Sequence, residues 1–178
     1  EASLNKTVRE TLNNPYGLNP VNEQSGPDTK DLRSVVYDKE AKSWIAPFVM
    51  AGINTKIVRR SNALLNYKYG KSFLYSEAML VGDGIMGKII GYLSLIPIFI
   101  VIQKKDSIIK RIVDLFVPKA GQGPSKKQRE NGFFNLKFYF NNGQQRYIAT
   151  VTGDMDPGYG STSKMLAECA ICLALDNT

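Results

Sequence analysis

Residues 44–65 read WIAPFVMAGINTKIVRRSNALL and form the longest stretch of the chain that has the periodicity of one helix. Apolar side chains recur along it at helical spacing, namely Ile45, Val49, Ile53, Ile57 and Leu64. Proline lacks an amide donor, so we expect the helix to begin near Pro47, with residues 44–46 as a lead-in. Further apolar residues fill the circumference of the first half, which predicts that this half is enclosed on nearly all sides.

The second half of the stretch carries a cluster of polar and charged side chains: Asn54, Thr55, Lys56, Arg59, Arg60, Ser61 and Asn62. A buried helix accepts such groups only where partners satisfy them, so we look for function at this end. We interpret Asn54, Arg59 and Arg60 as candidate substrate-binding residues, because a guanidinium group offers forked donors to a carboxylate or phosphate. Adjacent helical residues point about 100° apart, so an ordinary exposed helix end stays open as the alternative for the two arginines.

The composition limits the class of protein. A chain of 178 residues with 43% apolar residues is typical of one domain with an ordinary core. It contains no histidine, which excludes every histidine-dependent triad and, with only one cysteine pair present, most metal sites. We expect Cys169 and Cys172 to be small core residues in a protein from a reducing compartment, because their neighbours are apolar.

The net charge of the chain indicates what kind of partner it binds, and its first residue indicates whether the sequence is a piece of a longer protein. A net charge of +7 favours acidic partners without choosing among nucleic acid, anionic lipid and anionic substrates. The chain opens on Glu1 and has no signal segment, so we expect a processed product or a piece of a longer protein.

An apolar run over residues 89–102, interrupted by Ser94 and Pro97, precedes a basic segment. A bilayer-spanning helix needs about 20 residues, so we reject a transmembrane helix. Residues 104–130 then carry eight lysines or arginines, and apolar residues among them predict an amphipathic helix with a basic side. A core helix followed by a solvated one is one interpretation; the other is binding to an anionic lipid surface. The candidate lipid-surface residues are Ile98, Phe99, Ile100, Lys104 and Lys105.

The strongest β signal is an alternation of apolar and polar residues over 133–152. It is interrupted by Asn142 and Gly143, a pair that favours a hairpin turn. Residues 161–176 predict a closing helix with a small apolar face. We therefore expect an α+β or α/β fold in which a mixed sheet contains this hairpin and is covered by helices at 47–65, 85–116 and 161–176.

The loop GDMDPGYGSTSK at 153–164 joins a strand to a helix. It lacks the G-x-G-x-x-G fingerprint and the phosphate-loop lysine, and its aspartates would repel a phosphate. We interpret Asp154, Asp156 and Tyr159 as candidate catalytic residues of a substrate-facing loop, with a simple shaped turn as the alternative. The strand at 132–140 lacks the residues of an RNA-recognition module, so we do not expect a nucleic-acid partner.

Several separated motifs, in the same order, resemble the C-terminal half of the saccharopine dehydrogenase-like oxidoreductases, a group that includes trans-acting enoyl reductases. They are APFVMAGINTKIVRRSNALL, YGKSFLYSEAM, PKAGQGPSKKQRENGFFNLKFYF and TGDMDPGYGSTSKMLAECAICLALD. The resemblance covers the chain from about Asn14 onward. It implies that residues 1–178 are the C-terminal, substrate-side domain of a Rossmann-type oxidoreductase whose N-terminal nucleotide-binding domain is absent from this sequence.

The resemblance also implies an activity and partners. We expect the parent protein to be an NAD(P)-dependent oxidoreductase, with NAD or NADP bound by the N-terminal domain, acting on an acyl or lipid-like substrate. This piece alone would be inactive and cytoplasmic. The competing hypothesis is a non-catalytic module that binds a lipid surface through residues 89–102 and 104–129, peripheral to a membrane or lipid droplet. A homo-oligomer is compatible with both.

Overall fold

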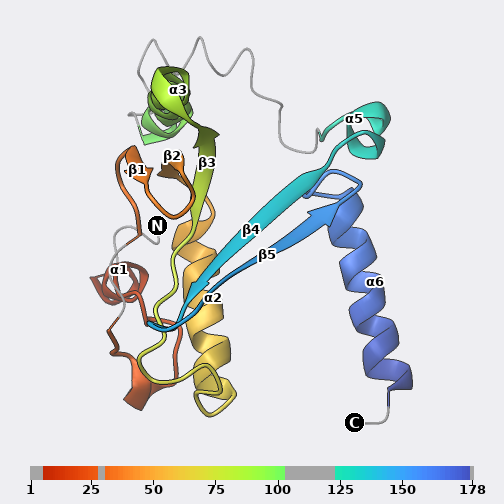
Figure 1. Ribbon diagram of the computed structural model, residues 1–178. Coiled ribbons are helices and arrows are strands. Elements are labelled where there is room, and N and C mark those ends of the chain that lie inside the picture. The colour runs from red at the N-terminus through yellow and green to blue at the C-terminus, as the bar shows by residue number, and fades with distance from the viewer. Residues whose placement is uncertain (1–5, 28–30, 103–122, 177–178) are drawn as a thin grey trace. The chain divides into compact units, whose positions relative to one another are not determined.

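The computed structural model describes residues 6–27, 31–102 and 123–176 (Figure 1). The chain divides into two compact units, Glu1–Lys110 and Arg111–Thr178, and each is described by itself. The first unit contains α1 (Lys6–Asn13), η1 (Val21–Glu23), β1 (Val36–Asp38), β2 (Ser43–Pro47), α2 (Ala51–Leu64), β3 (Ala78–Gly82) and α3 (Gly84–Ile102). The second unit contains α5 (Lys126–Glu130), β4 (Phe134–Asn141), β5 (Arg146–Gly153) and α6 (Gly160–Leu175).

β2 is the central strand of a three-stranded antiparallel sheet with the order β1-β2-β3. Ile45 of this strand pairs with Val36 of β1 and with Leu80 of β3. The expectation that residues 44–46 lead into a helix that starts near Pro47 was wrong, because α2 begins only at Ala51. Pairing with two strands that are distant in the sequence outweighs the helical spacing, and Pro47 ends the strand, where its missing amide interrupts little of the ladder.

The burial of α2 is the reverse of the expectation that its first half is enclosed. Large apolar side chains of the helix are exposed: Ile53 by 58%, Ile57 by 49% and Leu64 by 59%. The buried residues are instead small or polar, namely Ala51, Thr55, Lys56, Arg59, Asn62 and Ala63. The chain that follows α2 runs back along the helix toward β3 (Figure 1). Its backbone carbonyls are hydrogen-bond acceptors, and they favour polar side chains on the covered face.

α3 packs against β2 and β3 through glycines (Figure 1). A Cβ atom at Gly91 would lie 2.7 Å from the Cγ1 of Val35, and one at Gly87 would lie 2.2 Å from the carbonyl oxygen of Gly82. Only glycine allows the helix backbone to approach this closely. The helix expected over 85–116 is confirmed as far as α3 extends, and its remainder lies outside the described residues.

β4 and β5 form the hairpin that the alternation predicts over 133–152. Their register runs from Phe134 opposite Gly153 to Asn141 opposite Arg146. Gly143 in the turn has φ 85°, a conformation that glycine adopts without strain. The hairpin is a separate sheet, and every strand pair among the described residues is antiparallel. The α+β class is thus confirmed, whereas the single mixed sheet that we expected was wrong.

α6 confirms the predicted closing helix but not its burial. Cys169 and Cys172 are exposed free thiols, so the expectation that they are core residues was wrong. Buried residues of α6 are confined to its first turn, at Gly160 and Ser161. The apolar periodicity indicated a face suited to burial, and within its own unit that face has little to pack against.

Candidate functional site

Asn54, on the polar side of α2, forms a hydrogen-bond network with Tyr75 and Glu77 of the segment that precedes β3. Asn54 donates through Nδ2 to Oε2 of Glu77 at 2.9 Å, and the hydroxyl of Tyr75 donates to Oε1 of the same carboxylate at 2.9 Å. All three side chains are half-buried. The network therefore holds a carboxylate and a phenol in fixed orientation at a place that solvent still reaches.

The environment of Tyr75 changes its acidity. Burial, the hydrogen bond to Glu77 and the negative charge of Glu77 together raise the pKa of Tyr75 to about 12. Each of these factors disfavours the phenolate anion. Tyr75 consequently keeps its proton at neutral pH and serves as a hydrogen-bond donor.

Arg59 lies at the centre of this side of the helix and is only 4% exposed. Its Nη2 donates to the carbonyl oxygen of Tyr75 at 3.0 Å and its Nη1 to that of Pro15 at 3.3 Å. The guanidinium carbon also lies 5.6 Å from the centre of the Tyr16 ring. These contacts satisfy a buried charge and tie two distant segments to α2.

Arg60 is exposed and donates to the carbonyl oxygen of Leu18. The two arginines thus bind different backbone carbonyls, in agreement with their divergent directions on a helix. Asn54 and Arg59 both donate hydrogen bonds to the segment before β3, since their acceptors, Glu77 and the carbonyl of Tyr75, are two residues apart. Substrate binding by any of the three residues stays a prediction.

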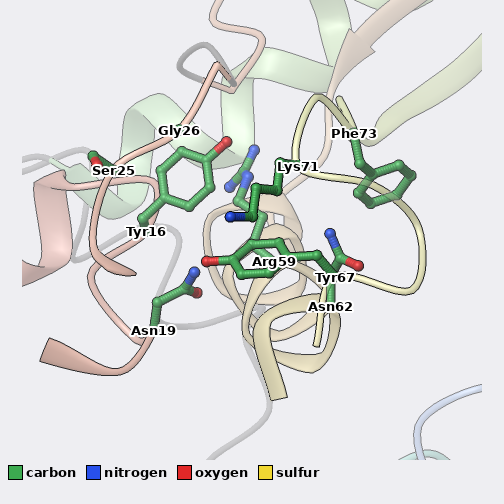
Figure 2. Close-up of a pocket in the computed structure, with 9 residues that line it drawn as sticks. All are labelled: Tyr16, Asn19, Ser25, Gly26, Arg59, Asn62, Tyr67, Lys71 and Phe73. Carbon is green, nitrogen blue, oxygen red and sulfur yellow. The ribbon is translucent and has the colours of Figure 1, made fainter. Parts of the chain in front are cut away.

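A small pocket opens beside Arg59 between α2 and the N-terminal loop (Figure 2). Its cavity volume is about 20 Å³, which is enough for roughly one water molecule. Nine residues line it: Tyr16, Asn19, Ser25, Gly26, Arg59, Asn62, Tyr67, Lys71 and Phe73. Asn19 is 5% exposed, and its Oδ1 is the one buried side-chain atom without a hydrogen-bond partner among the described residues. The pocket is too small to hold a substrate.

The three candidate catalytic residues of the second unit lie in the loop between β5 and α6. Asp156 accepts hydrogen bonds from the backbone amides of Tyr159 at 2.8 Å and Gly160 at 3.0 Å. Burial opposes ionisation of Asp156, but backbone amides and nearby Arg129 hold its pKa below the ordinary value. Asp156 therefore stabilises the start of α6, where the helix dipole favours an anion.

Asp154 forms an exposed ion pair with Lys164, with 2.7 Å between Oδ1 and Nζ. The hydrogen bond from Lys164 is the largest of the factors that lower the pKa of Asp154. Tyr159 is 58% exposed. The loop thus presents two ionised carboxylates and one phenol, and catalysis by them stays a prediction.

The predicted lipid-surface residues fall at the end of the described part of the first unit. Ile98, Phe99 and Ile100 lie on the backbone of α3, and Lys104 and Lys105 lie outside the described residues. Within the described ranges, no helix has both the length and the hydropathy needed to cross a membrane. The same ranges contain no cluster of three acidic or cysteine side chains that could hold a metal ion.

Sequence reasoning missed Tyr75 and Glu77 as site residues. Both occur in a motif that carries the family resemblance, YGKSFLYSEAM, but nothing in the spacing of that motif predicts a contact with α2. Asn54 and Glu77 are 23 residues apart. Their contact depends on how the chain returns along α2 (Figure 1).

The chain is similar to proteins named trans-acting enoyl reductases. The chain is 36% identical, over 98% of its length, to a provisionally named trans-acting enoyl reductase of Mycobacterium tuberculosis. It is 34% identical over 98% of its length to the trans-acting enoyl reductase of Mycobacterium bovis, and 36% identical over 75% to that of Mycobacterium ulcerans. All three relatives thus carry the name trans-acting enoyl reductase.

The match covers only part of each relative. The chain spans 44% of the M. tuberculosis and M. bovis proteins and 33% of the M. ulcerans protein. No family model matches the chain. No solved structure matches it either.

Proposed function

We propose that this chain is the C-terminal, substrate-side part of an NAD(P)-dependent oxidoreductase of the saccharopine dehydrogenase-like family, acting on an acyl or lipid-like substrate. The observation that carries the proposal is the similarity to trans-acting enoyl reductases along 98% of the chain. Such an enzyme adds a hydride and a proton across a carbon–carbon double bond. The nicotinamide cofactor supplies the hydride.

The described residues of this chain do not fit the dinucleotide itself. Two glycine-rich turns among these residues lead into long helices. The turn GDGIMG at 82–87 precedes α3 and has the G-x-G-x-x-G spacing, but it follows a strand of an antiparallel sheet, and the amide of Gly84 binds the carboxylate of Asp83 at 2.7 Å. In the loop before α6, the first amides of the helix already bind the carboxylate of Asp156. A pyrophosphate group at this position would also face the ionised Asp154. We therefore assign NAD or NADP to a Rossmann-type N-terminal domain, within the part of the longer relatives that this chain does not span.

The network of Asn54, Glu77 and Tyr75 is the part of the chain best suited to act on a substrate. Tyr75 offers a proton that it retains at neutral pH, and the carboxylate of Glu77 accepts a hydrogen bond from the Tyr75 hydroxyl and so fixes its position. A positioned acid near a reacting carbon contributes to proton transfer in reductions of this kind. Tyr159, Asp154 and Asp156 are the alternative proton-transfer group, from the second unit.

The test is to recover the full open reading frame and to purify the protein that it encodes. Oxidation of NADH and NADPH is then followed at 340 nm with α,β-unsaturated acyl thioesters of increasing chain length. We expect oxidation that depends on the acyl substrate, with Tyr75→Phe lowering kcat more than Tyr159→Phe. A frame without a nucleotide-binding region, or a full-length protein that oxidises neither cofactor with any acyl substrate, contradicts the proposal.

A second candidate function is a lipid-surface module, and the exposure of α3 favours it. Apolar side chains project from several sides of this helix, among them Ile85, which is 81% exposed, and Met86, which is 67% exposed. The basic segment at 104–129 would add attraction to anionic headgroups. Such a protein would be cytoplasmic and peripheral to a membrane or lipid droplet.

Liposome flotation tests this second function. We expect the chain to float with vesicles that contain phosphatidylserine, and to remain in the dense fraction when Ile98, Phe99 and Ile100 are replaced by serine. Absence of binding to anionic vesicles eliminates the lipid-surface module.

A further inference from the structure

One side of α2 is an exposed apolar ridge that consists of Ile53, Ile57 and Leu64. Residues four and seven apart on a helix lie above one another, so the three side chains form one row. Their exposed fractions are 58%, 49% and 59%. Just before the helix, Val49 and Met50 are also exposed and extend the apolar surface. We call the three helical residues the α2 ridge.

The opposite side of α2 explains why the ridge points outward. Thr55 is completely buried and donates to Oδ1 of Asp31, in a segment outside the helix, at 3.1 Å. Arg59 binds the carbonyl oxygens of two distant segments, and Asn62 donates to the carbonyl oxygen of Gly70 at 3.0 Å. Turning the ridge inward would bury apolar atoms only by breaking these hydrogen bonds, each of which serves a buried group. The polar contacts therefore orient the helix.

A helix of a folded protein normally buries its apolar stripe, and a contiguous exposed apolar surface indicates an interface. The curated relatives show what additional chain is available to cover it. Because this chain spans 44% of the M. tuberculosis relative, more than half of that relative lies outside the matched region. That additional part is large enough to form a domain of its own.

We infer that the α2 ridge is the surface on which this remaining part of the longer protein docks. The ridge is then packed between this chain and the nucleotide-binding domain that the remaining part contains. The inference deepens the proposed function, on which it rests for the nature of the partner. In the assembled protein, Ile53, Ile57 and Leu64 are buried at the interface. Asn54 and Glu77 then lie beside that interface, because Asn54 directly follows Ile53 and holds Glu77 at 2.9 Å.

Carbene footprinting with mass spectrometry tests the docking surface in unaltered proteins. The full-length protein and this chain alone are labelled side by side, and label is quantified at the α2 ridge. Leu12 and Val21 are matched apolar controls, being 59% and 85% exposed elsewhere in the first unit. We expect the ridge to be labelled in this chain alone and protected several-fold in the full-length protein, with the controls labelled in both.

A substitution provides an independent measurement. Ile57→Asp is expected to leave the Tm of this chain unchanged, because the side chain is exposed, and to lower the Tm of the full-length protein. Val21→Asp should change neither. Equal labelling of the ridge in both proteins, or an unchanged full-length Tm for Ile57→Asp, overturns the inference.

Other outcomes separate this inference from its alternatives. Protection that disappears on dilution identifies a second copy as the occupant and overturns the inference, as does an open reading frame that encodes no further residues. A protected ridge in a full-length protein without NAD(P)H oxidation contradicts the proposed function but leaves the docking surface intact. NAD(P)H oxidation by a full-length protein with an unprotected ridge contradicts the docking surface but leaves the proposed function intact.

Discussion

Replacing the buried Arg59 by methionine tests whether polar contacts orient α2. Methionine keeps the length of the side chain but removes the charge and the donors. Arg59 is 4% exposed and donates to the carbonyl oxygens of Pro15 and Tyr75 at 3.3 Å and 3.0 Å. Methionine would leave both carbonyls without these donors and remove the contact with the ring of Tyr16.

The magnitude follows from these bonds. A hydrogen bond to a charged group contributes about 1.5–3 kcal/mol, and we take the lower end of this range because one of the two bonds is long. The expected loss for Arg59→Met is therefore about 3 kcal/mol in the free energy of unfolding. Arg60→Met is the matched control, since Arg60 is exposed, and its expected effect is about 0.5 kcal/mol.

Urea unfolding followed by tryptophan fluorescence measures both variants. Trp44 is the single tryptophan and lies in β2, in the same unit as Arg59, so its signal reports the unit that is perturbed. The expected result is a clearly lower midpoint for Arg59→Met and a nearly unchanged one for Arg60→Met. Equal midpoints for the two variants would refute the claim that buried polar contacts hold the helix.

Three further outcomes are expected. In an absorbance titration at 295 nm, Tyr75 should ionise near pH 12, and Glu77→Gln should lower its pKa. Because the pKa of Tyr75 in the folded state exceeds the ordinary value of 10.0, Tyr75 stabilises the fold below pH 10, and this contribution is lost as the pH rises toward 12. Asp156→Asn should speed amide exchange in the first turn of α6 in NMR spectra, and acidification of the wild type through the lowered pKa of Asp156 should do the same. In thermal unfolding, Gly91→Ala should destabilise by about 1–3 kcal/mol, because its Cβ would lie 2.7 Å from the Cγ1 of Val35. Gly52→Ala should stabilise by about 0.5–1 kcal/mol, because the nearest atom outside the helix, Oδ2 of Asp31, is 4.0 Å from the added Cβ.

The elements that sequence reasoning predicted well are those determined by local contacts. The hairpin follows from alternation around Asn142 and Gly143, where the positive φ of Gly143 suits the turn. α6 follows from helical spacing after a polar start. In both cases the residues that determine the element lie within it or adjacent to it, so a short window of sequence contains the necessary information.

The strand at 43–47 is the clearest failure of local reasoning. Its residues have the spacing of a helix, yet they pair with β1 and β3, and β3 is more than 30 residues away. Strand propensity depends mostly on what packs beside the strand. A helical pattern that is only one turn long therefore cannot outweigh pairing on both edges.

By itself, the sequence determined a fold of helices and antiparallel strands, the hairpin, the closing helix and the helical spacing that gives α2 an apolar side and a polar side. Only the tertiary structure decided which of those sides is buried, and it selected the polar one. It also brought Glu77 and Tyr75 to Asn54, which no motif indicated. The physical reason is that burial and side-chain contacts depend on segments that return from elsewhere in the chain. The backbone carbonyls of those segments need hydrogen-bond donors, which Arg59 supplies and an apolar side chain does not.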